Sequence, residues 1–159
     1  MTRLLSILVA LLAYALIAAG LPQPVDSASV NKTDCSKPYW TSRVVPPPSI
    51  RVGITGRPND VTATRVKRIK TVPFKKYVKT VMRVEFPGWI ARRRPGGAAY
   101  IAAGAVAAKQ YAWYWTTQRP RYKANGNCFD VYDNVRDQVY DPGVQQTIRA
   151  EAETSEAVE

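Results

Sequence analysis

The sequence predicts a small α+β domain in which short strands pack with two helices. Residues 72–89 place apolar side chains at helical spacing, and residues 98–117 form a second, alanine-rich run of helical length. Shorter segments before and after these runs alternate between apolar and polar residues, as strands do. A chain of 159 residues, 46% of them hydrophobic, is long enough for one domain with a buried core.

Residues 1–20 have the pattern of an export signal. Arg3 precedes the apolar run of residues 4–19, and small residues that suit cleavage follow it. An uncleaved membrane anchor is the alternative, although the run is slightly shorter than the roughly 20 residues of a spanning helix. In either case we expect a secreted or cell-envelope protein.

Residues 21–49 are rich in proline and are predicted to be an arm or linker. The arm contains Cys35, and the only other cysteine is Cys128, near the end of the domain. In an oxidising compartment a disulfide between them would tie the arm to the domain. The alternative is two unpaired, buried thiols.

Residues 50–55 alternate and predict a strand, which a turn at residues 56–60 ends. Residues 61–71 alternate in part and predict an edge strand with a basic face. Pro73 then ends this strand and begins the first helix.

The first helix leads to a carboxylate. Its apolar face is formed by Phe74, Tyr77, Val78, Val81 and Met82, and Glu85 continues this face before Pro87 and Gly88 end the helix. A carboxylate at the end of an apolar face is desolvated, which raises its pKa and suits it to act as a general acid. The alternative is a partly exposed glutamate paired with a nearby arginine.

A basic loop follows, and Arg92 and Arg93 within it are candidates for binding a polar or acidic polymer. The second helix, residues 98–117, is rich in Ala and Gly, so the first helix can approach it closely. Exposed aromatic side chains near its end would stack on sugar rings or bases, but at least two of the four are expected in the core: Tyr111, Trp113, Tyr114 and Trp115.

Residues 118–127 are predicted as a polar loop, residues 128–133 as a short strand, and residues 138–143 as a closing segment. The tail from residue 144 is helical in pattern and acidic. Because no closing strand follows, the domain at residues 50–159 is expected to be incomplete at its C-terminus.

Composition excludes several kinds of site. The chain has no histidine, which removes Ser-His-Asp and Cys-His nucleophiles and all histidine-containing metal sites. Two cysteines cannot form a structural zinc site by themselves. The net charge of +11 favours an anionic partner, but no aromatic-and-basic nucleic-acid motif is present.

Taken together, these segments resemble the SpoIID/LytB family of stage II sporulation protein D-like domains. The Val-Pro lead-in, the Tyr-Val helix and the Glu-apolar-Pro motif of that family correspond here to residues 72–73, 77–78 and 85–87. Its alanine-rich helix corresponds to residues 103–112, and its Phe-Asp and Gln-Val-Tyr motifs to residues 129–130 and 138–140.

The resemblance implies a protein that acts on peptidoglycan glycan strands, as a lytic transglycosylase that leaves 1,6-anhydro ends. Glu85 would be the general acid and then the base, and the 6-hydroxyl of the substrate would be the nucleophile, so no second carboxylate is required. The alternative within the family is a non-catalytic, wall-binding enhancer of a separate cell-wall amidase. A two-carboxylate hydrolase using Asp130 or Asp133 is a further alternative.

The resemblance also bears on partners, on cofactors and on the other site residues. We expect no cofactor and no nucleic-acid partner. Some family members bind zinc through Cys and His, but this chain has Tyr132, Arg136 and Asp137 at the matching positions, so no metal is predicted. Gly104 and Lys109 replace a frequent Gln and an Arg of the family. Substrate contacts are expected from Arg92, Arg93, Tyr111, Gln138 and Tyr140.

Overall fold

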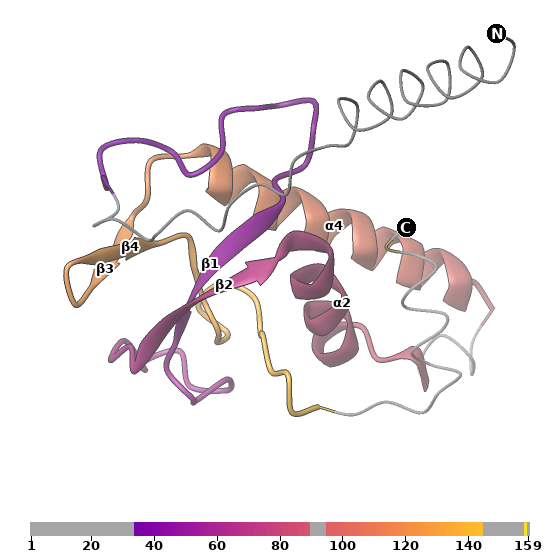
Figure 1. Ribbon diagram of the computed structural model, residues 1–159. Coiled ribbons are helices and arrows are strands. Elements are labelled where there is room, and N and C mark those ends of the chain that lie inside the picture. Colours follow the sequence, from indigo (N-terminus) through magenta and orange to yellow (C-terminus); the bar gives the residue numbers. More distant parts are fainter. Residues whose placement is uncertain (1–33, 90–94, 145–157, 159) are drawn as a thin grey trace, which may run out of the picture. The chain divides into compact units, whose positions relative to one another are not determined.

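The computed structural model describes residues 34–89, 95–144 and 158 (Figure 1). The predicted export signal, the loop with Arg92 and Arg93, and nearly all of the acidic tail lie outside these residues. Within them, no helix combines the length and the apolar character needed to cross a membrane. The elements are β1 (Ser49–Ile54), β2 (Arg68–Pro73), α2 (Phe74–Glu85), α4 (Gly97–Thr117), β3 (Tyr122–Ala124), β4 (Asn127–Phe129) and β5 (Val131–Tyr132).

Strand β1 is the centre of the main sheet, whose order in the described residues is β2-β1-β5. β1 runs antiparallel to β2, with Val52 opposite Lys70, and parallel to β5, with Val52 opposite Val131. A second sheet consists of the hairpin β3-β4. Short strands with two helices are the α+β fold that the sequence predicts.

One face of the main sheet is covered by helices α2 and α4 (Figure 1). Ile50, Val52 and Val72 lie on this face and are buried with the apolar face of α2. All five residues that the sequence assigns to that apolar face are buried. Helix α4 contributes mainly small side chains to the same core: Ala105, Ala108 and Ala112.

The hairpin β3-β4 covers the other face of β1, opposite the helices (Figure 1). Its turn is formed by Asn125 and Gly126, which both have positive φ (52° and 79°), the backbone of a type I′ turn. The ring of Phe129 lies directly on Gly53, where a Cβ would come within 2.5 Å of a ring carbon. Gly53 is therefore needed for the hairpin to pack this closely on β1.

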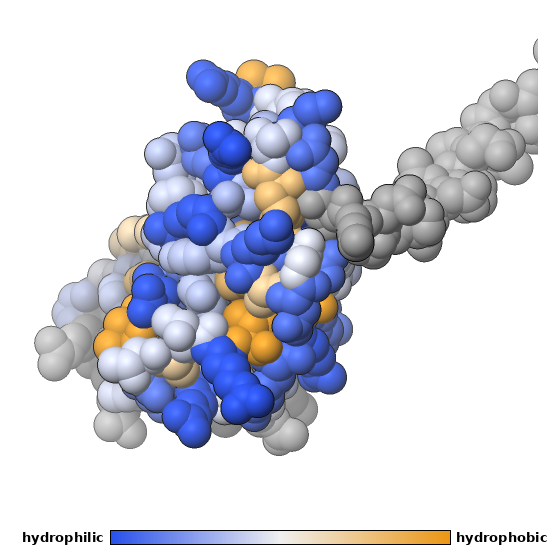
Figure 2. Space-filling model, turned by 90° about the vertical axis from the view of Figure 1, so that its left-hand side faces the viewer, coloured by the Kyte–Doolittle hydropathy of each residue, from blue (hydrophilic) through white to orange (hydrophobic). Residues whose placement is uncertain are grey.

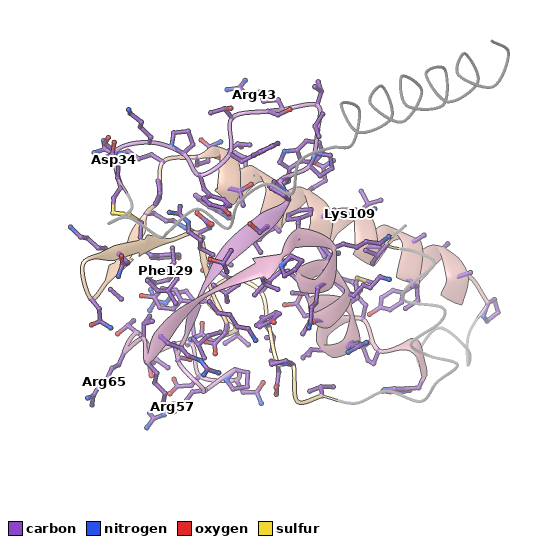
Figure 3. The ribbon with its side chains drawn as sticks, viewed as in Figure 1. Asp34, Arg43, Arg57, Arg65, Lys109 and Phe129 are labelled. Atoms are coloured by element: carbon purple, nitrogen blue, oxygen red, sulfur yellow. A yellow bond between two sulfur atoms is a disulfide. The ribbon has the colours of Figure 1, made fainter. Side chains whose placement is uncertain are left out.

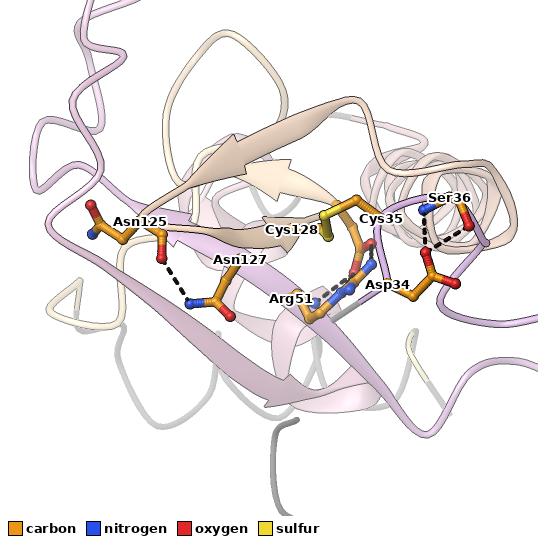
Figure 4. The surroundings of a disulfide bond; sticks show 8 residues. Asp34, Cys35, Ser36, Arg51, Asn125, Asn127 and Cys128 are labelled. Carbon is orange, nitrogen blue, oxygen red and sulfur yellow. Dashed lines mark hydrogen bonds and ion pairs between the residues drawn. A yellow bond between two sulfur atoms is a disulfide. The ribbon is translucent and has the colours of Figure 1, made fainter. Parts of the chain in front are cut away.

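The described part of the proline-rich segment is attached to the domain. Cys35 forms a disulfide with Cys128 of β4 (Figure 4). The backbone N–H of Trp40 donates to the carbonyl of Thr116 at the end of α4, 2.9 Å away. The indole N–H of Trp113 donates to the carbonyl of Ser42 at 3.2 Å. Residues 34–49 thus lie against both the hairpin and α4.

Three of the predicted elements differ from the structure. The edge strand predicted at residues 61–71 begins only at Arg68, because β1 ends at Ile54, opposite Arg68, and offers no partner to earlier residues. The loop predicted at residues 118–127 contains strand β3, and the strand predicted at residues 128–133 is divided at Asp130 into β4 and β5. These strands are only two or three residues long, too short to show alternation.

The face that includes the hairpin is mostly hydrophilic, with small, separate apolar areas (Figure 2). Exposed cations dominate the loop and strand at residues 57–70, with Arg57, Arg65, Lys67, Arg68 and Lys70. Figure 3 shows Arg57 and Arg65 at one end of the molecule. The small apolar areas on this face are scattered, as is normal for a protein surface, and they indicate no docking site.

Candidate active site around Glu85

Glu85 is the last residue of α2, and its side chain is half-buried. Its Oε1 accepts a hydrogen bond from the backbone N–H of Val139 at 2.8 Å. Burial raises the pKa of this carboxyl, and the Val139 N–H lowers it by less. No charged side chain of the described residues is among the causes of the shift. Glu85 is therefore a carboxyl that favours its protonated form more than an exposed glutamate does.

Phe86 anchors the end of α2 against α4. Its N–H donates to the carbonyl of Met82 at 3.1 Å, and its ring lies 5.5 Å from that of Tyr100. The ring also covers Gly104, where a Cβ would come within 2.4 Å of it. The absence of a side chain at residue 104 lets Phe86 sit directly on α4. This contact positions the adjacent Glu85.

Gln138, Val139 and Tyr140 lie along α2 and make consecutive contacts with it. The Tyr77 hydroxyl donates to Oε1 of Gln138 at 3.2 Å, and the Val139 N–H reaches Glu85. The Tyr140 ring stacks on Tyr77, with centroids 5.4 Å apart and planes at 12°. Gln138 and Tyr140 are buried, so both contact α2 rather than solvent. The segment holds the amide that orients Glu85.

The hydroxyls of two tyrosines in this cluster have raised pKa values. Burial is the main cause that raises the pKa of Tyr77, and the charges of Asp137 and Glu85 add to it. Tyr77 therefore stays neutral and acts as a hydrogen-bond donor. The Tyr140 hydroxyl is buried and has no hydrogen-bond partner among the described residues, and burial raises its pKa also.

Asp137, directly before Gln138, is the centre of a polar network. Its fully buried carboxylate forms an ion pair with Arg121. It accepts hydrogen bonds from the Tyr132 N–H (2.7 Å) and from the hydroxyls of Tyr111 (2.7 Å) and Tyr122 (3.3 Å). Burial, followed by the charge of Asp137, raises the pKa of Tyr122 to about 12. The network fixes the chain one residue before the Gln138–Tyr140 contacts with α2.

The carboxylates proposed for a hydrolase are engaged in the structure of the domain. Asp130 accepts from the backbone N–H of Arg51 at 2.8 Å and from its guanidinium at 2.6 and 3.2 Å. Burial raises the pKa of Asp130, and the Arg51 hydrogen bonds and charge oppose this. Asp133 accepts from the N–H and hydroxyl of Thr55 and from the N–H of Gly56, which fixes the turn after β1.

The structure thus brings several of the predicted site residues together. Glu85, Gln138 and Tyr140 meet on α2, and Tyr111 joins them through Asp137. Arg92 and Arg93 lie outside the described residues. Sequence reasoning did not identify Tyr77 as a hydrogen-bond donor, Asp137 with Arg121 as a network, or the Val139 amide. Among the described residues, no group of three His, Cys, Asp or Glu side chains is placed to hold a metal ion.

The aromatic residues near the end of α4 divide between two environments. Tyr111, Trp113 and Trp115 are partly buried and pack against the core, whereas Tyr114 is exposed. At least two of the four were expected in the core; three of them pack against it, but none is fully buried. Tyr111 also joins the network beside Glu85, because its hydroxyl donates to Asp137 at 2.7 Å.

Comparison with known proteins gives one match. A family model described as SpoIID, stage II sporulation protein, matches residues 62–159. No curated protein and no solved structure matches the chain significantly. The matched residues include α2, α4 and the Gln138–Tyr140 segment, whereas β1 and Cys35 precede them. Because the match covers more than half of the chain, this protein belongs to the stage II sporulation protein (SpoIID) family, which is related to sporulation and the cell wall.

Proposed function

We propose that this protein is an exported lytic transglycosylase that cleaves peptidoglycan glycan strands, with Glu85 as its general acid and base. The observation that carries the proposal is the environment of Glu85. It is half-buried at the end of α2, its pKa is raised by burial, and it accepts one oriented hydrogen bond from the Val139 amide. Such a carboxyl keeps its proton to higher pH than an exposed glutamate does, which suits it to act as a general acid.

The hydrogen bond from Val139 distinguishes the two oxygens of Glu85. An oxygen that accepts an N–H bond is the carbonyl-like one in a protonated carboxyl, which leaves the proton on Oε2. Oε2–H would protonate the leaving glycosidic oxygen as its bond to the anomeric carbon breaks. The resulting carboxylate would then accept the proton of the substrate's 6-hydroxyl, whose oxygen bonds to the anomeric carbon. Glu85 ends protonated, and no water is consumed.

The other carboxylates of the domain support a mechanism with one carboxylate. Asp130 is paired with Arg51, Asp133 binds the turn after β1, and Asp137 accepts several donors. A hydrolase would need a second reacting carboxylate, and each of these three described aspartates is already bound within the fold. The Cys35–Cys128 disulfide supports export, because structural disulfides persist in oxidising compartments.

The test is to incubate the protein with purified glycan strands, with and without stem peptides, and to identify the products by mass. We expect anhydro-ended fragments from the native protein and none from Glu85→Gln, which keeps the side-chain shape and an acceptor for the Val139 N–H. Fragments that have gained water would contradict the transglycosylase mechanism and support a hydrolase.

The second candidate within the family is a wall-binding enhancer of a separate amidase. It differs from the first in requiring no proton transfer at Glu85. Sedimentation with glycan strands, without any product from either substrate, would establish this role in place of the enzyme. In that case Glu85→Gln would bind strands as the native protein does. Tight DNA binding at physiological salt, without affinity for glycan, would contradict both candidates.

A further inference from the structure

A hollow lies away from Glu85, on the outer side of the C-terminal half of α4. It has a volume of about 500 Å³, within the range of roughly 300 to 1,000 Å³ that is typical of small-ligand sites. Its lining comes from α4, the residue that follows it, and the N-terminal arm: Arg43, Gln110, Trp113, Tyr114, Thr117 and Gln118. Figure 3 shows Arg43 on the arm beyond α4.

The spacing of these residues explains why one helix provides most of the hollow. One face of α4 carries four of the lining residues. Counted from Gln110, the other three follow after three, four and seven residues: Trp113, Tyr114 and Thr117. The opposite face carries Ala105, Ala108 and Ala112, which are buried in the core. The lining face therefore points away from these alanines, although Trp113 on it is partly buried against the core.

The aromatic rings of the hollow are held in place before any ligand binds. The Trp113 indole N–H donates to the carbonyl of Ser42 in the arm, which fixes the ring between α4 and the arm. Tyr114 is 55% exposed, and its ring meets the edge of Trp115 at a centroid distance of 4.9 Å. Ordered rings lose little conformational freedom on binding, which favours stacking of a ligand on Tyr114.

The polar lining indicates the chemistry of the ligand. Two primary amides, one hydroxyl and one guanidinium surround the rings, and no carboxylate lines the hollow among the described residues. Amides and hydroxyls pair with hydroxyl and N-acetyl groups, and aromatic faces pack against the apolar faces of sugar rings. A single cation is too few for the phosphate backbone of a nucleic acid, which is bound through several.

We propose that this hollow is an accessory subsite for the N-acetylated sugar rings of a peptidoglycan glycan strand. The proposal rests on the proposed function for the identity of the polymer. Phe86 packs on Gly104, ten residues before Tyr114, so the subsite lies about 15 Å farther along α4 from the level of the Glu85 motif. A strand that spans this distance would contact Tyr114 with rings that are not cleaved.

The experiment measures binding of peptide-free glycan strands to the full chain and to Tyr114→Ala and Tyr114→Phe. Loss of the ring should weaken binding by up to about tenfold, whereas Phe keeps the stacking face and should bind within about twofold of the native protein. Trp113 is left intact, because its substitution would also release the arm. Equal melting temperatures would show that the Tyr114 variants are folded.

The subsite and the proposed reaction fail in different ways. Glu85→Gln should abolish cleavage and leave binding of long strands unchanged. Tyr114→Ala should weaken binding of long strands but leave the cleavage of fragments too short to reach the subsite unchanged. Undiminished strand binding by a folded Tyr114→Ala would overturn the subsite, and so would binding that requires stem peptides. Absence of cleavage by the native protein would overturn only the reaction.

Discussion

The carboxylates of this domain differ sharply in how many hydrogen bonds they accept. Asp130, Asp133 and Asp137 each accept at least three hydrogen bonds, two of them with a guanidinium among the donors. Glu85 accepts one, from a backbone amide. Both oxygens of each of these three carboxylates accept hydrogen bonds from groups of the domain, so these carboxylates serve the fold. Within the part of the chain that the structure describes, Oε2 of Glu85 accepts no hydrogen bond, and burial raises the pKa of this carboxyl, which suits it to proton transfer.

The raised pKa of Glu85 predicts a pH-dependent effect of Glu85→Gln on stability. The folded-state pKa lies above the unfolded value of about 4.5, so the folded state binds the proton more tightly. Ionising the buried Glu85 carboxyl therefore lowers the free energy of unfolding. This loss is absent below about pH 4.5, where the carboxyl is protonated in both states, and it is complete once the pH has risen above the folded-state pKa. Relative to the native protein, Glu85→Gln should be more stable at pH 7 than at pH 4.

Thermal melts of both proteins across this pH range are the measurement for Glu85. The control is Asp141→Asn, which alters an exposed carboxylate that accepts from Gly143. A difference in melting temperature between native protein and Glu85→Gln that does not change with pH would show that the carboxyl is not desolvated in solution.

The Asp137 network predicts a large cost for Asp137→Asn. The variant removes the charge that pairs with Arg121 and presents an amide to the hydroxyls of Tyr111 and Tyr122, which now donate to Asp137. We expect a loss of about 2 to 4 kcal/mol in the free energy of unfolding, measured by urea titration. Asp60→Asn, at a solvent-exposed ion pair with Arg57, should lower the free energy of unfolding much less.

At the scale of the element, the close contact between α2 and α4 depends on Gly104. Gly104→Ala adds a methyl group where the Phe86 ring already lies. Alanine favours the helix by about 1 kcal/mol, so any net destabilisation must come from the collision. We expect a net loss of about 1 to 3 kcal/mol in the free energy of unfolding and displacement of the Glu85 motif.

A double-mutant cycle isolates this collision. Phe86→Ala removes the ring and should make Gly104→Ala neutral or stabilising, measured by chemical denaturation. If Gly104→Ala costs the same with and without the ring, the contact between α2 and α4 is not the cause. Ala107→Gly, at an exposed position of the same helix, reports the intrinsic helix preference alone.

The two helices and the central strand could be predicted because each has a period that repeats. The apolar residues of α2 recur at helical spacing, which also places Glu85 at the end of the buried face. The β3-β4 hairpin could not be predicted from the sequence, because strands of three residues contain too few positions to show alternation. Its Asn125-Gly126 turn was the available signal, and only Gly126 was interpreted as a turn.

The contacts around Glu85 were only partly accessible from the sequence. Gln138 and Tyr140 belong to a motif, and Tyr77 to another, but nothing in their order shows that these side chains meet across 61 residues. The donor at Val139 is the backbone amide, so the identity of the residue does not reveal the hydrogen bond to Glu85. The side-chain partners of Asp137 lie 15 to 26 residues away from it in the chain.

At the scale of the whole molecule, the Cys35–Cys128 disulfide closes a long loop. The two cysteines are 93 residues apart, and Cys128 is buried. A cross-link over such a span limits the unfolded chain, and its loss is expected to cost about 3 to 5 kcal/mol. We expect reductant to lower the melting temperature of the native protein to that of a Cys35→Ser/Cys128→Ser variant, and to leave the variant unchanged. An unaltered melt in reductant would contradict this expectation.

The position of β1 bears on how this domain is cut for experiments. β2 and β5 have no contact with each other in the sheet and are joined only through β1, which ends eight residues before the family match begins at residue 62. An expression fragment that starts at that boundary would lack the central strand of the sheet and the disulfide. It would also lack Arg51, which binds Asp130, and Thr55, which binds Asp133. Such a fragment would expose two strand edges and aggregate, and an inactive preparation of it would say nothing about Glu85.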